Sequence, residues 1–163
     1  MTDPANWHRR SGGARSGEIV IFDLDGVMSD ASPRQVHLRG GVLDWDAFFA
    51  AGIHDEPLDA GITLARLVNL PIVVLTARPH FVQVDTVDWL KRHGVPFDLV
   101  ITRPEADSRS SVDFKQAEVE SLRRAGYNIA LAVDDDPSNV EMYRSCGVEA
   151  VYVYSGYYDI DLG

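Results

Sequence analysis

Short apolar runs alternate with longer amphipathic segments along most of this chain. Five of the runs are rich in β-branched residues and are bounded by polar or turn-forming residues, a pattern typical of buried parallel strands. They cover residues 19–22, 72–75, 99–101, 129–133 and 150–154. We expect each run to be a strand of one sheet.

The segments between these runs place apolar residues at helical spacing. The candidates are residues 58–70, 81–93, 112–125 and 138–146. The last three end at Gly94, Gly126 and Gly147, and glycine often follows the C terminus of a helix. Strands that alternate with helices predict an α/β fold: a doubly wound, mainly parallel, five-stranded Rossmann-like sheet with helices on both faces. Ligands bind such sheets outside the carboxyl ends of the strands, so we expect the chemistry there.

Acidic residues gather at these strand ends. Three ends carry five acids, a hydroxyl and an arginine: Asp23, Asp25, Thr76, Arg78, Asp134, Asp135 and Asp136. Carboxylates this close repel one another, so the arrangement calls for a cation. Oxygen ligands without a cluster of cysteine and histidine indicate Mg²⁺ rather than Zn²⁺.

Helix capping is the alternative for each single residue of this set. Asp135 or Asp136 can cap the helix that begins near Pro137, and Thr76 can cap the helix that follows it. Capping does not explain acids on both sides of Leu24, nor three acids in a row. The joint pattern therefore favours a cation-binding site.

The composition is that of an ordinary globular protein with an acidic balance. The 163 residues fit one domain, or one domain with a tail, and the formal net charge is −10. This charge argues against a protein that covers a long stretch of nucleic acid backbone, but it is compatible with one that grips only a strand end. The single cysteine, Cys146, excludes an intrachain disulfide. Without an apolar membrane span or a signal peptide, we expect a cytoplasmic protein that does not bind membranes.

The first 17 residues differ from the rest in composition. They combine glycine and serine with Arg9, Arg10 and Arg15, which predicts a flexible basic tail over residues 1–17 and a single domain over residues 18–163. A short nucleic-acid-binding arm is the alternative for the tail.

Four segments, in order, resemble the four motifs of the haloacid dehalogenase (HAD) superfamily. They are the run ending in Asp23, Leu24, Asp25 and Gly26, the run ending in Thr76, the residue Lys115, and the sequence Ala132, Val133, Asp134 and Asp135. The resemblance spans residues 19 to about 155. It implies a HAD-like phosphatase domain over nearly all of the chain.

The resemblance also implies a role for each of these residues. Asp23 would attack phosphorus and form an aspartyl-phosphate, while Asp25 would protonate the leaving oxygen and then accept a proton from water. Thr76 would hydrogen-bond a phosphoryl oxygen, and Lys115 would offset negative charge. A solvated helix residue is the alternative for Lys115, one of only two lysines. The implied cofactor is Mg²⁺, with Asp23, the carbonyl of Asp25, Asp134 and Asp135 as its ligands.

The spacing of the motifs leaves little room for a cap. Large cap domains of this superfamily follow the first or the second motif, and here each interval must also hold a predicted helix. We expect no large cap domain, only a compact lid near residues 34–49. An open site suits a bulky or polymeric phosphoester.

Two segments resemble one branch of the superfamily more closely. Residues 130–149, and residues 103–109 leading to Lys115, are similar to the 3′-phosphatase domains of T-even phage polynucleotide kinase-phosphatases. This resemblance implies that the substrate is bound by Arg34, Arg78, Asp107 and Arg109. The arginines would hold a phosphate through forked hydrogen bonds. A solvated position is the alternative for Arg34, and Arg39 is a rival for its role.

The sequence departs from that branch at two positions. Ala77 stands where the relatives carry glycine, and Asp136 replaces an arginine, which puts a negative charge near the phosphate. No Gly-x-x-x-x-Gly-Lys-Ser/Thr loop is present, so we expect no 5′-kinase activity from this chain.

Together these features predict a Mg²⁺-dependent phosphomonoester hydrolase that removes 3′-phosphate from DNA or RNA ends, with a partner kinase or ligase on a separate chain. A small-molecule phosphatase such as a nucleotidase is the alternative, and a catalytically silent binding module is a third hypothesis. Trp45, Phe48 and Phe49 fit core or lid packing, or the stacking of a base at a strand terminus.

Overall fold

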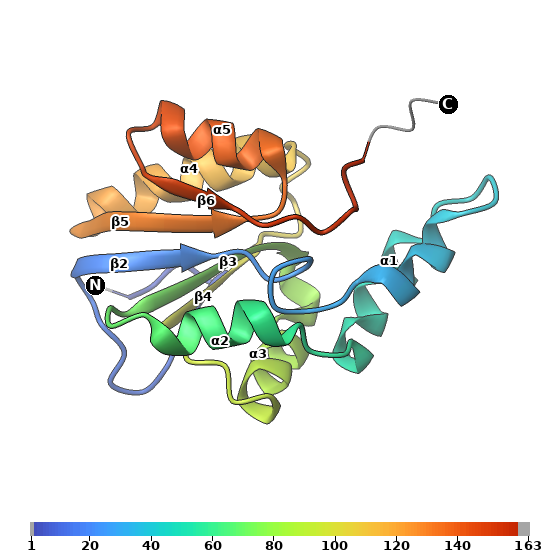
Figure 1. The fold of residues 1–163 in the computed structure, drawn as a ribbon, viewed down its shortest axis with the longest axis horizontal. Coiled ribbons are helices and arrows are strands. Elements are labelled where there is room, and N and C mark those ends of the chain that lie inside the picture. The colour runs from blue at the N-terminus through green and yellow to red at the C-terminus, as the bar shows by residue number, and fades with distance from the viewer. Residues whose placement is uncertain (1, 160–163) are drawn as a thin grey trace.

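A six-stranded sheet forms the centre of the computed structural model, which describes residues 2–159. The strand order is β1-β4-β3-β2-β5-β6, and all neighbours are parallel except β1 and β4. Figure 1 labels β2 to β6. The strands are β1 (Trp7–Arg9), β2 (Gly17–Phe22), β3 (Ile72–Pro79), β4 (Leu99–Arg103), β5 (Tyr127–Asp134) and β6 (Ala150–Tyr152). The predicted mainly parallel α/β sheet is confirmed, with six strands instead of five.

Helices cover both faces of this sheet, as the alternating pattern predicts. Two lie against one face, α2 (Asp59–Leu67) and α3 (Gln83–Arg92), and two against the other, α4 (Ser111–Arg124) and α5 (Pro137–Ser145). Each coincides with a predicted helix to within a few residues. A short 3₁₀ turn, His80–Val82, precedes α3 and takes up the first residues predicted for it.

The predicted flexible tail is wrong for residues 7–9, which form the sixth strand. Strand β1 pairs antiparallel with β4, and the Trp7 side chain is buried. Its indole Nε1 donates a hydrogen bond of 2.8 Å to Glu118 on α4, and the Asn6 side chain donates one of 3.1 Å to the same carboxylate. Composition misses this strand because distant residues hold it in place. Residues 160–163 of the predicted domain lie outside the described residues.

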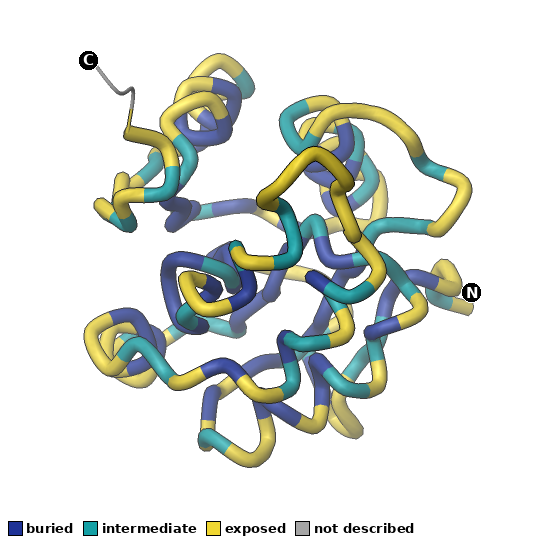
Figure 2. Tube along the Cα trace, turned by 90° about the vertical axis from the view of Figure 1, so that its right-hand side faces the viewer, coloured by how far each residue is buried: buried dark blue, intermediate teal, exposed yellow. Residues whose placement is uncertain are grey.

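A compact lid lies between β2 and α2. It consists of the 3₁₀ segment η1 (Ser32–Leu38), helix α1 (Trp45–Ala50) and the 3₁₀ turn η2 (Ala51–His54). The Asp44 side chain caps α1 by accepting a hydrogen bond from the backbone N–H of Ala47. Figure 2 looks onto this end of the molecule, where exposed lid segments stand in front of buried strands. No large cap domain is present within residues 2–159, in agreement with the motif spacing.

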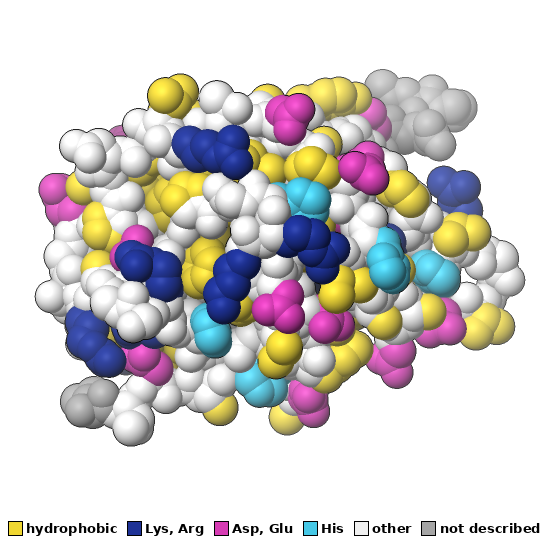
Figure 3. Space-filling model, turned by 90° about the horizontal axis from the view of Figure 1, so that it is seen from below, with side chains coloured by type: hydrophobic (Ala, Val, Ile, Leu, Met, Phe, Trp, Pro, Cys, Tyr) yellow, Lys and Arg dark blue, Asp and Glu magenta, His cyan; other side chains and the backbone are white. Residues whose placement is uncertain are grey.

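The surface mixes charges of both signs. On the face shown in Figure 3, basic, acidic and histidine side chains lie interspersed among neutral ones. Among the residues that the structure describes, no helix is long and apolar enough to cross a membrane.

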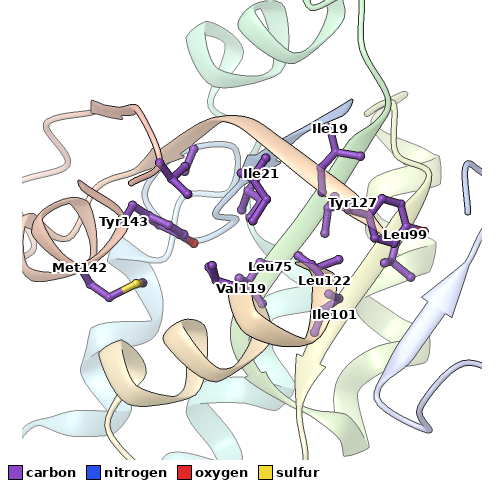
Figure 4. Packing of buried hydrophobic residues seen from close by; sticks show 14 of the residues in the cluster. Ile19, Ile21, Leu75, Leu99, Ile101, Val119, Leu122, Tyr127, Met142 and Tyr143 are labelled. Carbon is purple, nitrogen blue, oxygen red and sulfur yellow. The ribbon is translucent and has the colours of Figure 1, made fainter. Parts of the chain in front are cut away.

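Alternate residues of the central strand feed two apolar clusters. Ile19 and Ile21 of β2 pack with α4 and α5, whereas Val20 and Phe22 pack with α2 and α3. Figure 4 shows the first cluster, in which Val119 and Leu122 of α4 face the strands. This two-sided packing holds the carboxyl end of β2 between its neighbours, and the candidate site begins at that point.

Candidate active site

The first feature of the site is a lysine held between two carboxylates. Asp23 follows β2 directly, and its backbone N–H donates a 2.9 Å hydrogen bond to the carbonyl of Val133. Lys115 reaches this point from α4, with its Nζ 3.0 Å from Asp23 Oδ1 and 2.7 Å from Asp134 Oδ2. Because Lys115 is 1 % exposed, the solvated alternative for this residue is wrong.

Three carboxylates share this corner of the sheet. Oxygens of Asp23, Asp134 and Asp135 lie within 4.8 Å of one another, and all three residues are buried. The backbone N–H of Asp136 and the side chain of Asn139 hydrogen-bond Asp134. Neither oxygen of Asp135 receives a hydrogen bond from any residue between 2 and 159.

A glycine makes room for the unpaired carboxylate. Gly26 has a φ of 82°, and a Cβ at that position would lie 2.0 Å from Asp135 Oδ2. The chain therefore approaches Asp135 more closely than any side chain at position 26 permits. A buried, unpaired carboxylate beside two others is costly unless a cation joins them, so the residues present fit a divalent ion with oxygen ligands.

The electrostatics of this corner are strongly perturbed. Burial raises the pKa of Asp23 well above its usual range, and the neighbouring carboxylate of Asp134 adds to the effect. Burial also raises the pKa of Asp135. Although burial opposes the charge on Lys115, the carboxylates of Asp134 and Asp23 hold its pKa well above its usual value. One ammonium group thus faces three acids, and the cluster has an excess of negative charge.

Asp25 lies beside this cluster and forms ion pairs with two arginines. Its Oδ1 is 2.6 Å from Nη2 of Arg78 and 2.7 Å from Nη2 of Arg34. Burial would raise the pKa of Asp25, but these guanidinium groups outweigh it and hold the pKa below its usual value. Both arginines are almost fully buried, so the solvated alternative for Arg34 is wrong.

A fourth member completes this network, and sequence reasoning missed it. Asp55 lies 2.7 Å from Nη2 of Arg34 and 3.1 Å from Nη2 of Arg78, and it also accepts a 2.6 Å hydrogen bond from Ser29. No local motif marks Asp55. Only charge balance could have pointed to Asp55, since two buried arginines need more than one carboxylate.

The remaining predicted residues differ in where the structure places them. Thr76 is buried in β3 and accepts a 3.2 Å hydrogen bond from the backbone N–H of Arg78, so it does not cap the following helix. Asp107 pairs with half-exposed Arg109 at 2.5 Å, and the hydrogen bonds from Arg109 lower the pKa of Asp107 to about 2. Asp136 caps α5 by accepting a 2.9 Å hydrogen bond from the backbone N–H of Ser138.

A cleft of about 910 Å³ opens above these groups. Its floor includes Asp23, Asp25, Thr76 and Lys115. Its walls come from the lid, from the loop after β4 and from the C-terminal segment, with Trp45, Phe48, Phe49, Arg103, Asp107, Tyr157 and Tyr158. Arg109 does not line this cleft, whereas Arg103, to which sequence reasoning gave no role, does.

Comparison with known proteins agrees with this arrangement. Residues 17–158 match the model of a protein family described as the polynucleotide kinase PNKP phosphatase domain. The chain belongs to this family. It is therefore a phosphatase of the HAD superfamily. The strand β1, residues 7–9, precedes the matched region.

Solved structures show the same fold. A chain in the Pnkp1/Rnl/Hen1 complex has a TM-score of 0.69 and 21 % identity, with 88 % of this chain and 47 % of that chain covered. A chain in the Pnkp1/Rnl/Hen1 RNA repair complex has a TM-score of 0.69 and 19 % identity, with 93 % and 46 % covered. This chain thus spans about half the length of those two. A haloacid dehalogenase-like hydrolase of Streptococcus pneumoniae has a TM-score of 0.55 and 13 % identity, with 82 % and 83 % covered. No curated protein matches the chain.

Proposed function

We propose that this phosphatase is a Mg²⁺-dependent phosphomonoester hydrolase that uses Asp23 as its nucleophile. The observation that carries the proposal is the unpaired carboxylate of Asp135, buried within reach of Asp23 and Asp134. In a folded protein, a cluster of this kind is explained by a cation that it binds. A cation held by this cluster would also allow an anionic nucleophile to approach an anionic substrate.

Each residue of the floor has a defined task in this proposal. Asp23 Oδ attacks phosphorus, so a P–O bond to the carboxylate forms while the bond to the leaving oxygen breaks. Lys115, already 3.0 Å from Asp23, stabilises the charge that accumulates on nucleophile and phosphate. Thr76 donates its hydroxyl hydrogen to a phosphoryl oxygen. Asp23, Asp134, Asp135 and the backbone carbonyl of Asp25 would hold Mg²⁺, which would supply Lewis-acid stabilisation of the phosphoryl oxygens.

Asp25 handles protons in both half-reactions. The guanidinium groups of Arg34 and Arg78 favour its ionised form, which is the form that accepts a proton from the hydrolytic water. To protonate the leaving oxygen, Asp25 must first take up a proton, which the arginines oppose and the negative charge of a bound phosphate favours. The expected roles of Arg34 and Arg78 therefore change in our proposal, because they position Asp25 and do not grip the substrate phosphate.

The proposed substrate is a nucleic acid end that carries a 3′-phosphate, in DNA or RNA repair. The family description names a polynucleotide kinase phosphatase domain, and the open cleft has room for a strand terminus. Asp107, with Arg109 outside the cleft, orders the loop beside the entrance, and Arg103 would offer a positive charge to an incoming phosphodiester. A kinase or ligase on a separate chain and a cytoplasmic location complete the proposal.

A panel of phosphorylated substrates tests this function. Phosphate release from a 3′-phosphorylated oligonucleotide, from its 5′-phosphorylated counterpart and from free mononucleotides is measured with Mg²⁺ and with EDTA. We expect Mg²⁺-dependent release from the 3′-phosphorylated oligonucleotide. Turnover of mononucleotides alone would replace the repair function with that of a nucleotidase, and no turnover of any substrate would indicate a silent binding module.

A further inference from the structure

Aromatic side chains line the cleft above Asp23, and the ring of Trp45 is half-exposed there. On the lid side, Trp45 and Phe49 stack with ring centroids 5.9 Å apart and an interplanar angle of 27°. Trp45 is 48 % exposed although it belongs to a short helix whose neighbour Phe48 is buried. Exposed aromatic rings beside a reactive floor are typical of a ligand site.

The lid is held firmly enough to serve as a wall. Nη1 of Arg34 donates a 3.1 Å hydrogen bond to the carbonyl of Phe48, and the same guanidinium lies 4.6 Å above the Phe48 ring. Because Arg34 also binds Asp25, α1 is anchored to the buried network at the floor. Trp45 and Phe49 therefore stand at a fixed place relative to Asp23.

The C-terminal segment brings two more rings to the cleft. The hydroxyl of Tyr157 accepts a 2.8 Å hydrogen bond from the backbone N–H of Ala31 and donates one of 3.1 Å to Asp30, which fastens this segment to the base of the lid. Tyr158 lines the same cleft as Asp23.

The charges around the cleft disfavour binding of the substrate through its sugar–phosphate backbone. Arg103 is the only basic side chain among the described residues that line the walls, and the protein carries a net charge of −10. Backbone binding needs several cations along a track, whereas aromatic rings hold bases of any sequence without them. The volume of about 910 Å³ accommodates a terminal nucleotide and its neighbour.

We propose that Trp45 and Phe49 form a stacking site for the base of the nucleotide that carries the scissile 3′-phosphate. This inference rests on the proposed function and adds the group by which the substrate is recognised. Binding energy from the base is made in the ground state and in the transition state alike, so loss of the ring raises KM and leaves kcat unchanged. Since stacking carries no charge, KM for a short oligonucleotide also changes little with salt.

Two matched substrates and three variants test the stacking site. One 3′-phosphorylated oligonucleotide carries a base at its last nucleotide, and the other is abasic there. β-Glycerophosphate, which has no ring, monitors the chemistry at Asp23. The variants are Trp45→Ala, Trp45→Phe and Phe81→Ala, the last removing an exposed ring that does not line the cleft.

For the base-bearing substrate, Trp45→Ala should raise KM by about 5- to 100-fold, which corresponds to the loss of one stacked base. KM for the abasic substrate and for β-glycerophosphate should stay unchanged, Trp45→Phe should recover most of the loss, and Phe81→Ala should behave as the native protein. Equal KM values of the native protein for both oligonucleotides, or an equal loss on all substrates in Trp45→Ala, would overturn the stacking site and leave the proposed function standing. Turnover of β-glycerophosphate alone would overturn both.

Discussion

Two groups of buried charges lie side by side at the carboxyl end of β2, and they are balanced in different ways. In the acid cluster, Asp23, Asp134 and Asp135 face the single ammonium group of Lys115. In the arginine network, Arg34 and Arg78 face Asp25 and Asp55. The network has as many carboxylates as guanidinium groups, whereas the acid cluster has two carboxylates too many.

This difference separates a site for chemistry from its support. Every carboxylate of the arginine network is hydrogen-bonded, so the network is complete as the chain folds. The acid cluster leaves Asp135 without a partner within residues 2–159 and lies on the cleft, so it is complete only with a cation. The same substitution, aspartate to asparagine, should therefore have opposite effects in the two groups.

The largest effect is expected from Asp23→Asn, which removes the proposed nucleophile. Phosphate release with Mg²⁺ should fall by at least about 10⁴-fold, as loss of a nucleophile does in other enzymes that act through covalent intermediates. A phosphate-release assay measures it. Asp136→Asn is the control, because asparagine keeps the cap of α5 and the activity should persist. Activity of Asp23→Asn within tenfold of the native protein would contradict the assignment.

A second prediction breaks the arginine network. Asp55→Asn leaves two buried guanidinium groups with one carboxylate, and the free energy of unfolding should fall by roughly 3 kcal/mol. Urea denaturation measures the loss. Asp59→Asn, at an exposed position of α2, should change stability by less than about 0.5 kcal/mol. An equally small change for Asp55→Asn would mean that the network does not need its fourth member.

The same change in the acid cluster should act in the other direction. Without Mg²⁺, Asp135→Asn relieves the repulsion among three carboxylates, so the free energy of unfolding should rise by about 1 kcal/mol. With Mg²⁺ the native protein should gain stability, about 2.7 kcal/mol at a hundred times the Kd, and the variant should gain less because its Kd is at least about tenfold higher. Thermal unfolding in EDTA and in Mg²⁺ compares them. A variant less stable than the native protein in EDTA would contradict the account.

The last prediction concerns a third buried acid, Glu118, which neutral donors satisfy. Trp7→Phe removes the indole hydrogen bond to Glu118 and should cost about 1.5 kcal/mol at pH 8. Burial raises the pKa of Glu118, so the carboxyl takes up a proton on acidification and the cost of the lost donor should shrink at pH 5. Urea denaturation at both pH values measures this, with half-exposed Trp45→Phe as the control. A loss of stability that is the same at both pH values would mean that Trp7→Phe acts through packing and not through the hydrogen bond to Glu118.

Local patterns in the sequence predicted the sheet with helices on both faces and the acidic residues of the candidate site. The apolar runs and the glycines after the helices depend on neighbouring residues, and Gly94 indeed has a φ of 62° at the end of α3. The approach of Asp23, Asp134 and Asp135 followed from their places at parallel strand ends.

Contacts between residues that are far apart in the sequence could not be predicted from it. Strand β1 depends on β4 and Glu118, far away in the sequence, so basic composition suggested a tail. Likewise, nothing beside Arg34 or Arg78 shows that they turn inward to Asp25 and Asp55 and away from the substrate. Local patterns identify the charged residues, and only the fold assigns their partners.

The most direct test of the central claim traps the phosphorylated protein. The enzyme is quenched during turnover of a 3′-phosphorylated oligonucleotide, treated with borohydride, which reduces an acyl phosphate to an alcohol, and analysed by peptide mass spectrometry. The account predicts homoserine in place of aspartate at position 23, dependent on both Mg²⁺ and substrate. Unmodified Asp23 in an enzyme that turns over, or homoserine at position 25 instead, would contradict it.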